Sequence, residues 1–442
     1  MLTALLACAS SAPEPPAAPP SVLLVVLDTV RADHTELADA GKTPQLRAIG
    51  DAGLVFTDAT APGPWTWPSH ASLFTGEAPW VHGAHGSSRE DGMALKDTLR
   101  VTPLREDLPT LAGQLGGAGF RTEAFVANRL LSQPLGLTRD FDAVSFERDD
   151  AVVTRQAIEA MGGEEPLFLF VNLMSAHSPY HPSPGAPGPE TQQWTEPWRT
   201  EDGGLSWFTR TPDAQQLLAR GELEIPPEGL DLLDALYSGE VTRADFHLNQ
   251  LVAAWQQARP HSVIAVTSDH GEYLGEHGFL EHSGSTYRQV TDIPLVLAGA
   301  GVEPGRIDTP VMLQDLYGTI LELTGVAEAA VSLVRPDSLD PQRPVVSVAW
   351  TRPHLAEAVG GRLAEPWVSY RVGERAVVVH GETVELYATS DPTMSTDLAD
   401  QEPALAASLA EAARAIPLNE VSGGVQVDPA MLSQLEALGY IQ

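Results

Sequence analysis

The sequence predicts an α/β fold built on a mostly parallel β-sheet flanked by helices. Apolar runs without polar alternation carry this prediction, because such runs are typical of strands buried on both faces. The runs are Val22–Asp28, Leu167–Leu173, Ser262–Ser268 and Ile293–Ala298, with Thr122–Ala127 as a shorter candidate. Helical patterns lie between them, at Pro44–Gly53, Leu108–Ala118, Ala151–Met161, Leu230–Arg259 and Val311–Thr324. The alternation of strands and helices indicates an α/β class.

After about residue 335 the pattern changes to short strand-like runs separated by turns, and a small C-terminal antiparallel α+β subdomain is expected. Short strands joined at Gly373 and Gly381 are predicted at Val368–Val372, Arg375–Val379 and Val384–Tyr387. Two helices are predicted to follow, at Pro403–Ala415 and Pro429–Leu438. The expected organisation is therefore a catalytic domain over 21–334 and the small subdomain over 335–442.

Residues 183–229 interrupt the alternating pattern. They are rich in Pro, Gly, acidic residues and Trp. A segment this irregular is usually a surface excursion or an active-site lid. We expect it to be an insertion in the catalytic domain.

The composition excludes several classes of function. The chain has 26 basic and 59 acidic residues in 442, a net charge of −33. Nucleic acids and anionic membranes both require a basic face, so neither is an expected partner. The single cysteine excludes a disulfide framework, a thiolate zinc site and an iron–sulfur cluster.

The cysteine itself, Cys8, ends a short apolar stretch. The sequence LLAC at residues 5–8 resembles a bacterial lipobox, and the Pro-rich residues 9–20 are typical of a tether. We expect a lipoprotein signal over 1–20 and a protein anchored through Cys8 in the cell envelope, on its periplasmic or extracellular face. The alternative is a disordered tail in which the cysteine has no role.

Clusters of hard ligands follow two of the predicted strands. Asp28 ends the first run, and the pair Asp269–His270 follows the run at Ser262–Ser268. In parallel sheets, ligands bind beyond the carboxyl ends of the strands. Oxygen and imidazole ligands without sulfur fit a divalent cation such as zinc, manganese, calcium or magnesium.

Further polar candidates come from other segments. His177 follows the strand at Leu167–Leu173, and His282 lies shortly after the Asp269–His270 pair. Thr66 stands where a helix begins, because Pro68 suits an early helical position and Gly76 a helix end. A hydroxyl at a helix N-terminus beside a cation loses its proton more readily. Taken alone, Thr66 is typical of an ordinary N-cap.

The order of these segments resembles the sulfatase family of the alkaline phosphatase superfamily. The matching stretches are LLVVLDTVRADH, TPQLRAIGDAGLVFTDATAPGPWTWPSHASLFTG, TSDHGEYLGEHG and IPLVLAGAG, followed by VMLQDLYGTILELTG, ELYATSDPTMSTDLAD and LEALGYIQ. The resemblance covers roughly residues 22–442. It implies an alkaline-phosphatase-like fold and a metal-activated nucleophile that attacks a sulfate or phosphate ester.

Carried over position by position, the resemblance implies roles for seven residues. The metal ligands would be Asp28, Thr66, Asp269 and His270, with Thr66 also the nucleophile. His177 and His282 would contact the ester oxygens or help to hold a second metal, and one of them would protonate the leaving group. His70 takes the place of an arginine that steadies the nucleophile.

Departures from the family pattern point towards phosphoryl chemistry. Sulfatases proper carry Cys or Ser at the position of Thr66 and oxidise it to formylglycine, which threonine cannot form. Thr29 replaces the second acid of the usual Asp–Asp pair, and His282 replaces a late lysine. The Lys-x-His element has no counterpart near Thr122–Leu131. Threonine nucleophiles occur in phosphodiesterases and phosphoethanolamine transferases of the superfamily.

We therefore expect a metal-dependent hydrolase of sulfate or phosphate esters that works by in-line attack and a covalent intermediate. The cation would be Ca²⁺, Zn²⁺ or Mn²⁺, with one ion or two bound. The ester would be a glycan, lipid headgroup or aryl ester. The alternatives are a phosphodiesterase or phosphoethanolamine-type transferase, and a non-catalytic anchored binding protein with a degenerate site.

Other polar residues in the two motifs have simpler interpretations. Arg31, Asp33 and His34 are expected to fix the loop after the first strand. Glu272, Glu276 and His277 are expected to form a solvated turn.

Overall fold

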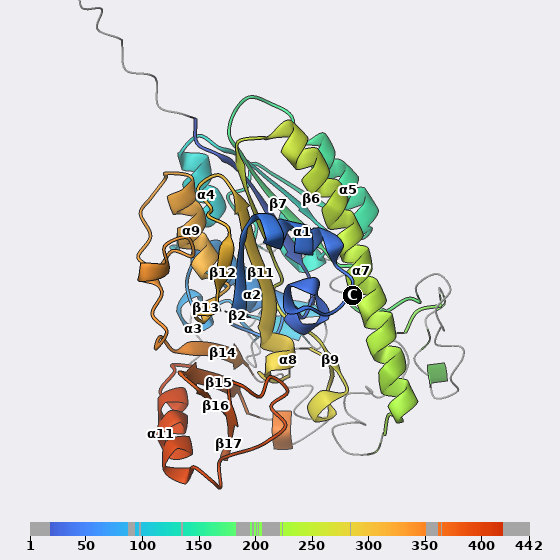
Figure 1. Ribbon diagram of the computed structural model, residues 1–442, viewed down its shortest axis with the longest axis vertical. Helices are drawn as coiled ribbons and strands as arrows, with labels where there is room; N and C mark the ends of the chain where they lie inside the picture. Colours follow the sequence, from blue (N-terminus) through green and yellow to red (C-terminus); the bar gives the residue numbers. More distant parts are fainter. Residues whose placement is uncertain are drawn as a thin grey trace, which may run out of the picture.

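The computed structural model describes most of the chain, and Figure 1 shows its arrangement. The described residues are 18–86, 93–96, 99–133, 136–182, 195–196, 199, 201, 203–205, 222, 224–282, 284–350, 361–363 and 365–418. Cys8, the helix expected at Pro429–Leu438 and most of 183–229 lie outside these residues. No helix within them combines the length and hydrophobicity needed to cross a membrane.

A twisted central sheet forms the middle layer. Within the described residues it has nine strands, and eight run in the order β12 (Gly305–Ile307), β2 (Leu54–Thr60), β11 (Asp292–Gly299), β8 (Ser262–Thr267), β1 (Ser21–Leu27), β7 (Leu167–Leu173), β5 (Arg121–Val126) and β6 (Ala143–Phe146). The ninth, β13 (Val311–Met312), pairs with β2. β1 runs parallel to both β7 and β8, and all its residues are buried. The predicted α/β class with a mostly parallel sheet is confirmed.

Helices cover both faces of this sheet (Figure 1). Alternate side chains of β1 enter two separate cores, Leu23 and Val25 on one face and Val22 and Leu24 on the other. The first core is completed by α1 (Pro44–Ala52), α5 (Asp150–Glu159) and α7 (Pro227–Ala258). The second is completed by α2 (Thr66–Thr75), α4 (Leu111–Gly117) and α9 (Asp315–Leu323).

Several elements of this sheet differ from the sequence prediction, and two of them, β11 and β2, pair with each other. The run at Ile293–Ala298 is a buried strand as predicted, but β11 is antiparallel to both its neighbours. β2 was not predicted, because its sequence LVFTDAT mixes buried residues with the exposed Thr57. In the strand order, both lie towards the β12 edge of the sheet, whereas β1 and β7 lie towards the β6 edge.

One predicted helix begins later than expected. The pattern at Val311–Thr324 predicts a single helix, but Val311 and Met312 extend the sheet as β13. The Asp315 carboxylate accepts a hydrogen bond from the Met312 amide at 2.8 Å. Asp315, three residues after Met312, is the first residue of α9. The carboxylate therefore stops the chain from continuing one helix through the whole pattern.

The antiparallel C-terminal sheet lies below the central sheet in Figure 1. Its strands are β14 (Val345–Ala349), β15 (Trp367–Val372), β16 (Arg375–His380) and β17 (Thr383–Ala388), and α11 (Pro403–Arg414) packs against it. Gly373 and Gly381 each have a φ of 55° at the two predicted turns. An ion pair between Arg371 and Asp58 joins this sheet to β2.

The loop after β1 is fixed to α7 by polar contacts. Arg31 pairs with Asp33 and, at 2.6 Å, with Glu276. The His34 ring lies between Asp33 and Asp234, 2.9 Å from an oxygen of each. These contacts bear out the expectation that the motif residues of this loop hold it in place.

Replacing His34 with glutamine is expected to destabilise the protein more in acid than in alkali. Burial opposes protonation of His34, but its hydrogen bonds to Asp234 and Asp33 prevail and raise its pKa above the ordinary value. A histidine pKa raised by folding stabilises the protein fully below the unfolded pKa, and this contribution is lost as pH rises through the folded pKa. We expect a loss of about 0.5–1 kcal/mol near pH ~5.5 and a smaller loss near pH ~9. Urea unfolding at both pH values measures it, and an equal loss at both would contradict the expectation.

Candidate active site

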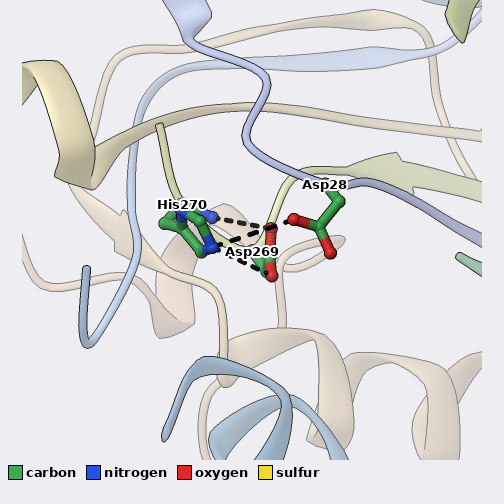
Figure 2. Close-up of side chains that lie close together, drawn as sticks. All are labelled: Asp28, Asp269 and His270. Carbon is green, nitrogen blue, oxygen red and sulfur yellow. Dashed lines mark hydrogen bonds and ion pairs between the residues drawn. The ribbon is translucent and has the colours of Figure 1, made fainter. Parts of the chain in front are cut away.

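The carboxyl ends of β1 and β8 bring two acids and a histidine together. These strands are parallel neighbours, with Val26 beside Thr267 in the register. Asp28 and the pair Asp269–His270 follow directly, so their side chains meet at one edge of the sheet. Figure 2 shows the three side chains facing one another.

The ligand atoms of this group are close enough to share one ion. His270 Nε2 lies 3.9 Å from Asp28 Oδ1 and 3.4 Å from Asp269 Oδ2. One nitrogen or oxygen from each residue lies within 4.8 Å of the other two, and all three residues are buried. In the part of the chain that the structure describes, this is the one such group of at least three acidic, histidine or cysteine ligands.

Three of these atoms lack hydrogen-bond partners although they are buried. They are Asp28 Oδ1, Asp269 Oδ2 and His270 Nε2. An unpaired buried polar atom costs about 1–3 kcal/mol, and an unpaired charge costs more. Three of them converge on one point, and a divalent cation there would satisfy them all. The donor set therefore fits the predicted metal site.

The other atoms of the same side chains are satisfied by the protein. Asp269 Oδ1 accepts from the amides of Thr29 and His270, at 3.3 and 3.0 Å. His270 Nδ1 bonds the Gly271 carbonyl at 2.9 Å, which orients Nε2 into the site. In each of these side chains, one atom is thus hydrogen-bonded to the protein and the other is available to bind an ion.

Burial and mutual repulsion set the charge of the group. Burial raises the pKa of Asp269 well above its usual value, and the nearby Asp28 raises it further. Burial opposes ionisation of Asp28, but His270 and His177 lower its pKa overall. Burial lowers the pKa of His270 well below the ordinary value. Asp28 therefore ionises more readily than Asp269, and a bound cation would favour the ionised form of both acids.

Thr29, between Asp28 and the rest of the loop, adopts an uncommon backbone conformation. Its φ is 62°, in the left-handed region that β-branched residues rarely enter. Its carbonyl accepts from the Tyr237 hydroxyl at 2.7 Å, which helps to hold this conformation. Its own hydroxyl is buried and has no hydrogen-bond partner. The position of the missing second acid is therefore a strained one.

Thr66 is the first residue of α2, a helix whose residues are all buried. Trp65 is the N-cap, so the interpretation of Thr66 as an ordinary N-cap is wrong. The Thr66 hydroxyl oxygen instead accepts a hydrogen bond from Asn128 Nδ2 at 3.0 Å, and the same nitrogen lies 2.8 Å from Asp28 Oδ2. A single amide thus connects the predicted nucleophile with the ligand group.

His70 lies one helical turn after Thr66 and is completely buried. Its Nδ1 is 3.0 Å from the Thr66 carbonyl oxygen and 3.4 Å from Asp269 Oδ2. Its ring contacts those of Phe74 and Phe170. Burial lowers the pKa of His70 to about 4, so the ring is neutral at neutral pH. The structure places it beside Asp269, and the role of steadying the nucleophile stays a prediction.

His177 and His282 lie next to each other, and His282 lies next to the ligand group. Their ring centroids are 5.1 Å apart, and the His282 ring lies 4.4 Å from that of His270. Both are partly buried. The structure therefore brings together the two predicted ester-contacting histidines and the predicted metal ligands.

Glu272 contradicts the expectation of a solvated turn. It is completely buried, contacts His282 Nδ1 at 2.9 Å and accepts from the Tyr180 hydroxyl at 2.8 Å. Burial raises its pKa to about 8. These contacts could not be predicted from the sequence, because Tyr180 comes from a distant segment. Glu276 and His277, in contrast, are partly exposed.

Replacing Glu272 with alanine is expected to lower kcat about 10–100-fold, because His282 loses the partner that orients its ring. The affinity for the activating ion should change little, since Glu272 is not in the ligand group. Tyr180→Phe is the matched control, because it removes the other hydrogen bond of Glu272 and leaves the contact with His282. Steady-state kinetics at saturating ion measure the effect. Equal losses in the two variants would show that His282 does not depend on Glu272.

Two asparagines at the same edge of the sheet were not predicted as site residues. Asn172, in β7, donates to Asp28 Oδ2 at 3.2 Å, and Asn128 follows β5. Asn128 lies within the segment singled out for lacking the Lys-x-His element. Its place just beyond the end of a parallel strand is the one signal in the sequence that pointed to it.

Comparison with known proteins decides the family. The family model described as Sulfatase matches residues 20–326, more than half of the chain. The chain belongs to the sulfatase family. The resemblance seen in the sequence motifs is thereby confirmed.

Several proteins with known names resemble this sulfatase-family chain. A "Sulfatase" from Formosa agariphila is 25% identical over 385 residues, which cover 72% of each chain. A "Choline-sulfatase" from Rhizobium meliloti is 21% identical over 455 residues, with 89% of this chain and 82% of the relative covered.

Solved structures share the fold of this sulfatase-family chain. A phosphonate monoester hydrolase from Silicibacter pomeroyi has a TM-score of 0.64 and 21% identity, covering 89% of this chain and 94% of its own. A 2-O GAG sulfatase has a TM-score of 0.64 and 19% identity, covering 89% and 90%. These neighbours support the predicted alkaline-phosphatase-like architecture.

Proposed function

We propose that this ester hydrolase of the sulfatase family is metal-dependent and uses Thr66 as its nucleophile. One observation carries the proposal. Three buried ligand atoms without partners, on Asp28, Asp269 and His270, converge beside a helix-start hydroxyl that Asn128 links to Asp28. This arrangement is typical of a site for charge-assisted displacement at an ester.

A bound divalent cation would supply Lewis-acid stabilisation of negative charge on the hydroxyl and ester oxygens. The Thr66 hydroxyl gives up its proton to water as its oxygen attacks the sulfur or phosphorus atom in line, and the bond from that atom to the leaving oxygen breaks. The leaving oxygen takes a proton from His282 or His177. Water then cleaves the threonyl ester and restores the Thr66 hydroxyl.

Glu272 supports a proton-transfer role for His282. Since Glu272 contacts Nδ1 of His282, Nε2 is the ring atom that exchanges a proton with the ester. The same contact holds the ring in one orientation. A histidine supported in this way is suited to general acid and general base catalysis.

The proposed substrates are sulfate or phosphate esters of a glycan, a lipid headgroup or an aryl alcohol. A relative named choline-sulfatase and a structural neighbour named as a GAG sulfatase support sulfate esters as substrates. Structural neighbours named phosphonate monoester hydrolases support phosphate esters. Threonine at position 66 favours phosphoryl transfer, because threonine cannot become formylglycine. The same residue keeps a phosphodiesterase or phosphoethanolamine-type transferase as a second candidate.

The ligand group favours a single ion. His177 and His282 do not join Asp28, Asp269 and His270 in the ligand group found among the described residues. Ca²⁺ takes about six to eight oxygen ligands, whereas an imidazole with two carboxylates suits Zn²⁺ or Mn²⁺. We therefore expect Zn²⁺ or Mn²⁺ to activate the enzyme better than Ca²⁺.

A panel of p-nitrophenyl esters tests the proposed function. The sulfate, the phosphate, the phosphodiester and a phosphonate monoester are offered to chelator-treated protein, with and without Zn²⁺, Mn²⁺ or Ca²⁺. We expect ion-dependent release of p-nitrophenol from at least one ester. Ion binding without turnover of any ester would overturn the proposal and favour a binding protein with a degenerate site.

Anchoring through Cys8 is part of the same proposal. Its support is the lipobox-like stretch and the Pro-rich tether that follows it. Expression in a bacterium with radiolabelled palmitate should label the wild-type protein but not a Cys8→Ala variant. Equal labelling of both would exclude lipidation at Cys8.

A further inference from the structure

We infer that Asn128 is a catalytic residue whose side-chain amide stabilises the attacking oxygen of Thr66. The inference rests on the proposed role of Thr66 as nucleophile. It concerns a group that belongs to neither the ligand set nor the histidine pair. Its basis is the position of a single nitrogen atom between two reactive groups.

Asn128 Nδ2 makes two hydrogen bonds into the site. It lies 3.0 Å from Thr66 Oγ1 and 2.8 Å from Asp28 Oδ2. An amide nitrogen carries two hydrogens, so both are used. Asn128 is 5% exposed, so water competes little for these hydrogens.

The rest of the Asn128 residue fixes which way the amide points. Its Oδ1 accepts from the Leu130 backbone amide at 3.0 Å, and its own backbone amide donates to Asn172 Oδ1 at 2.9 Å. An amide rotated by half a turn would present an oxygen to the Asp28 carboxylate and lose the bond to Leu130. The hydrogen-bond network therefore assigns the nitrogen to the site.

This donor acts on the atom that reacts. Because Thr66 Oγ1 accepts from Asn128, its own proton must leave in another direction. Negative charge then develops on Oγ1, and a hydrogen bond to a charged oxygen is roughly twice as strong as one to a neutral oxygen. Removing one preorganised donor of this type lowers kcat about 10²–10³-fold.

The chain provides a matched control for this role. Asn172 Nδ2 donates to Asp28 Oδ2 at 3.2 Å, and no contact joins it to Thr66 among those the structure records. Loss of either asparagine weakens the hold on Asp28. Only loss of Asn128 removes the hydrogen bond to Thr66.

The experiment compares Asn128→Ser with Asn172→Ser. Serine still caps the short helix that follows Asn128, but its side chain is too short to reach Thr66. Ion affinity is measured by titrating chelator-treated protein with Zn²⁺ or Mn²⁺, and kcat is measured on the best p-nitrophenyl ester at saturating ion. We expect weaker ion binding in both variants. At saturating ion, turnover should fall about 100-fold in Asn128→Ser. It should fall by a clearly smaller factor in Asn172→Ser, which loses a contact with the Asn128 backbone amide but keeps the hydrogen bond to Thr66.

Single-turnover kinetics locate the affected step. Rapid quenching and mass spectrometry follow the threonyl ester at Thr66, and its formation should be slowed by the same factor as kcat. Asn128→Asp keeps the acceptor for Leu130 but has no N–H, so it should show a loss of formation rate at least as large. Thermal unfolding confirms that each variant is folded.

The outcomes separate this inference from the proposed function. Full kcat in Asn128→Ser or Asn128→Asp at saturating ion would overturn the inference, as would a loss equal to that of Asn172→Ser. Absence of ester turnover in the wild-type protein, or full turnover in Thr66→Ala, would instead overturn the proposed function.

Discussion

Replacing Thr66 with alanine is expected to lower kcat by at least about 10⁴-fold, the largest effect of any single substitution in this chain. The substitution removes the attacking oxygen and leaves the ligand group in place. Ion binding should therefore be nearly unchanged. The variant is expected to bind the ester but not to form a covalent intermediate.

The measurement pairs steady-state kinetics on the panel of esters with mass spectrometry of quenched enzyme. Thr66→Ser retains a hydroxyl and should retain much of the activity. Thr75→Ala is the matched control on the same helix, because the Thr75 hydroxyl bonds the Ala71 carbonyl and the Glu77 amide and makes no contact with the ligand group among those the structure records. If Thr66→Ala turned over the ester at the wild-type rate, another group would be the nucleophile.

Replacing Asp269 with asparagine is expected to stabilise the metal-free protein and abolish its response to ions. Asp269 Oδ1 accepts two backbone hydrogen bonds, which the asparagine carbonyl can keep, whereas Oδ2 has no partner. Folding raises the pKa of Asp269, so ionisation of this acid at neutral pH opposes folding. Asparagine carries no charge, and we expect a gain of about 1–3 kcal/mol.

Chemical unfolding with and without Zn²⁺ or Mn²⁺ measures both effects. The matched control is Asp315→Asn, because Asp315 is also buried but pairs with Arg343 through both oxygens. That variant should be destabilised. A loss of stability in metal-free Asp269→Asn would mean that the site has no unpaired charge to relieve, and the metal assignment would fail with it.

The parallel half of the sheet was predictable because its signal is local. Val22–Asp28, Leu167–Leu173 and Ser262–Ser268 are continuous apolar runs, and they form β1, β7 and β8. The direction of β11 was not predictable, because it depends on how β11 pairs with β2 and β8. The sequence of β11 itself carries no information on that pairing. The helix predicted at Val311–Thr324 begins only at Asp315, whose carboxylate contacts the Met312 amide, and periodicity carries no sign of that contact.

Of the site residues, some were predictable from the sequence and others were not. Asp28, Asp269 and His270 follow predicted strands directly, so their convergence was expected from the sheet alone. Glu272 and Asn128 were missed because their roles come from tertiary contacts, to Tyr180 and His282 in one case and to Thr66 in the other. A carboxylate in a polar motif and an asparagine after a strand are common in positions without a role.

The left-handed backbone at Thr29 has a consequence for how the ligand set can change over evolution. Asparagine and aspartate tolerate this conformation far better than a β-branched residue does. An acidic substitution at position 29 would therefore relieve backbone strain and at the same time supply another oxygen beside Asp28. Beside the two carboxylates and the imidazole, it would shift the donor set towards the oxygen-rich sets that suit Ca²⁺.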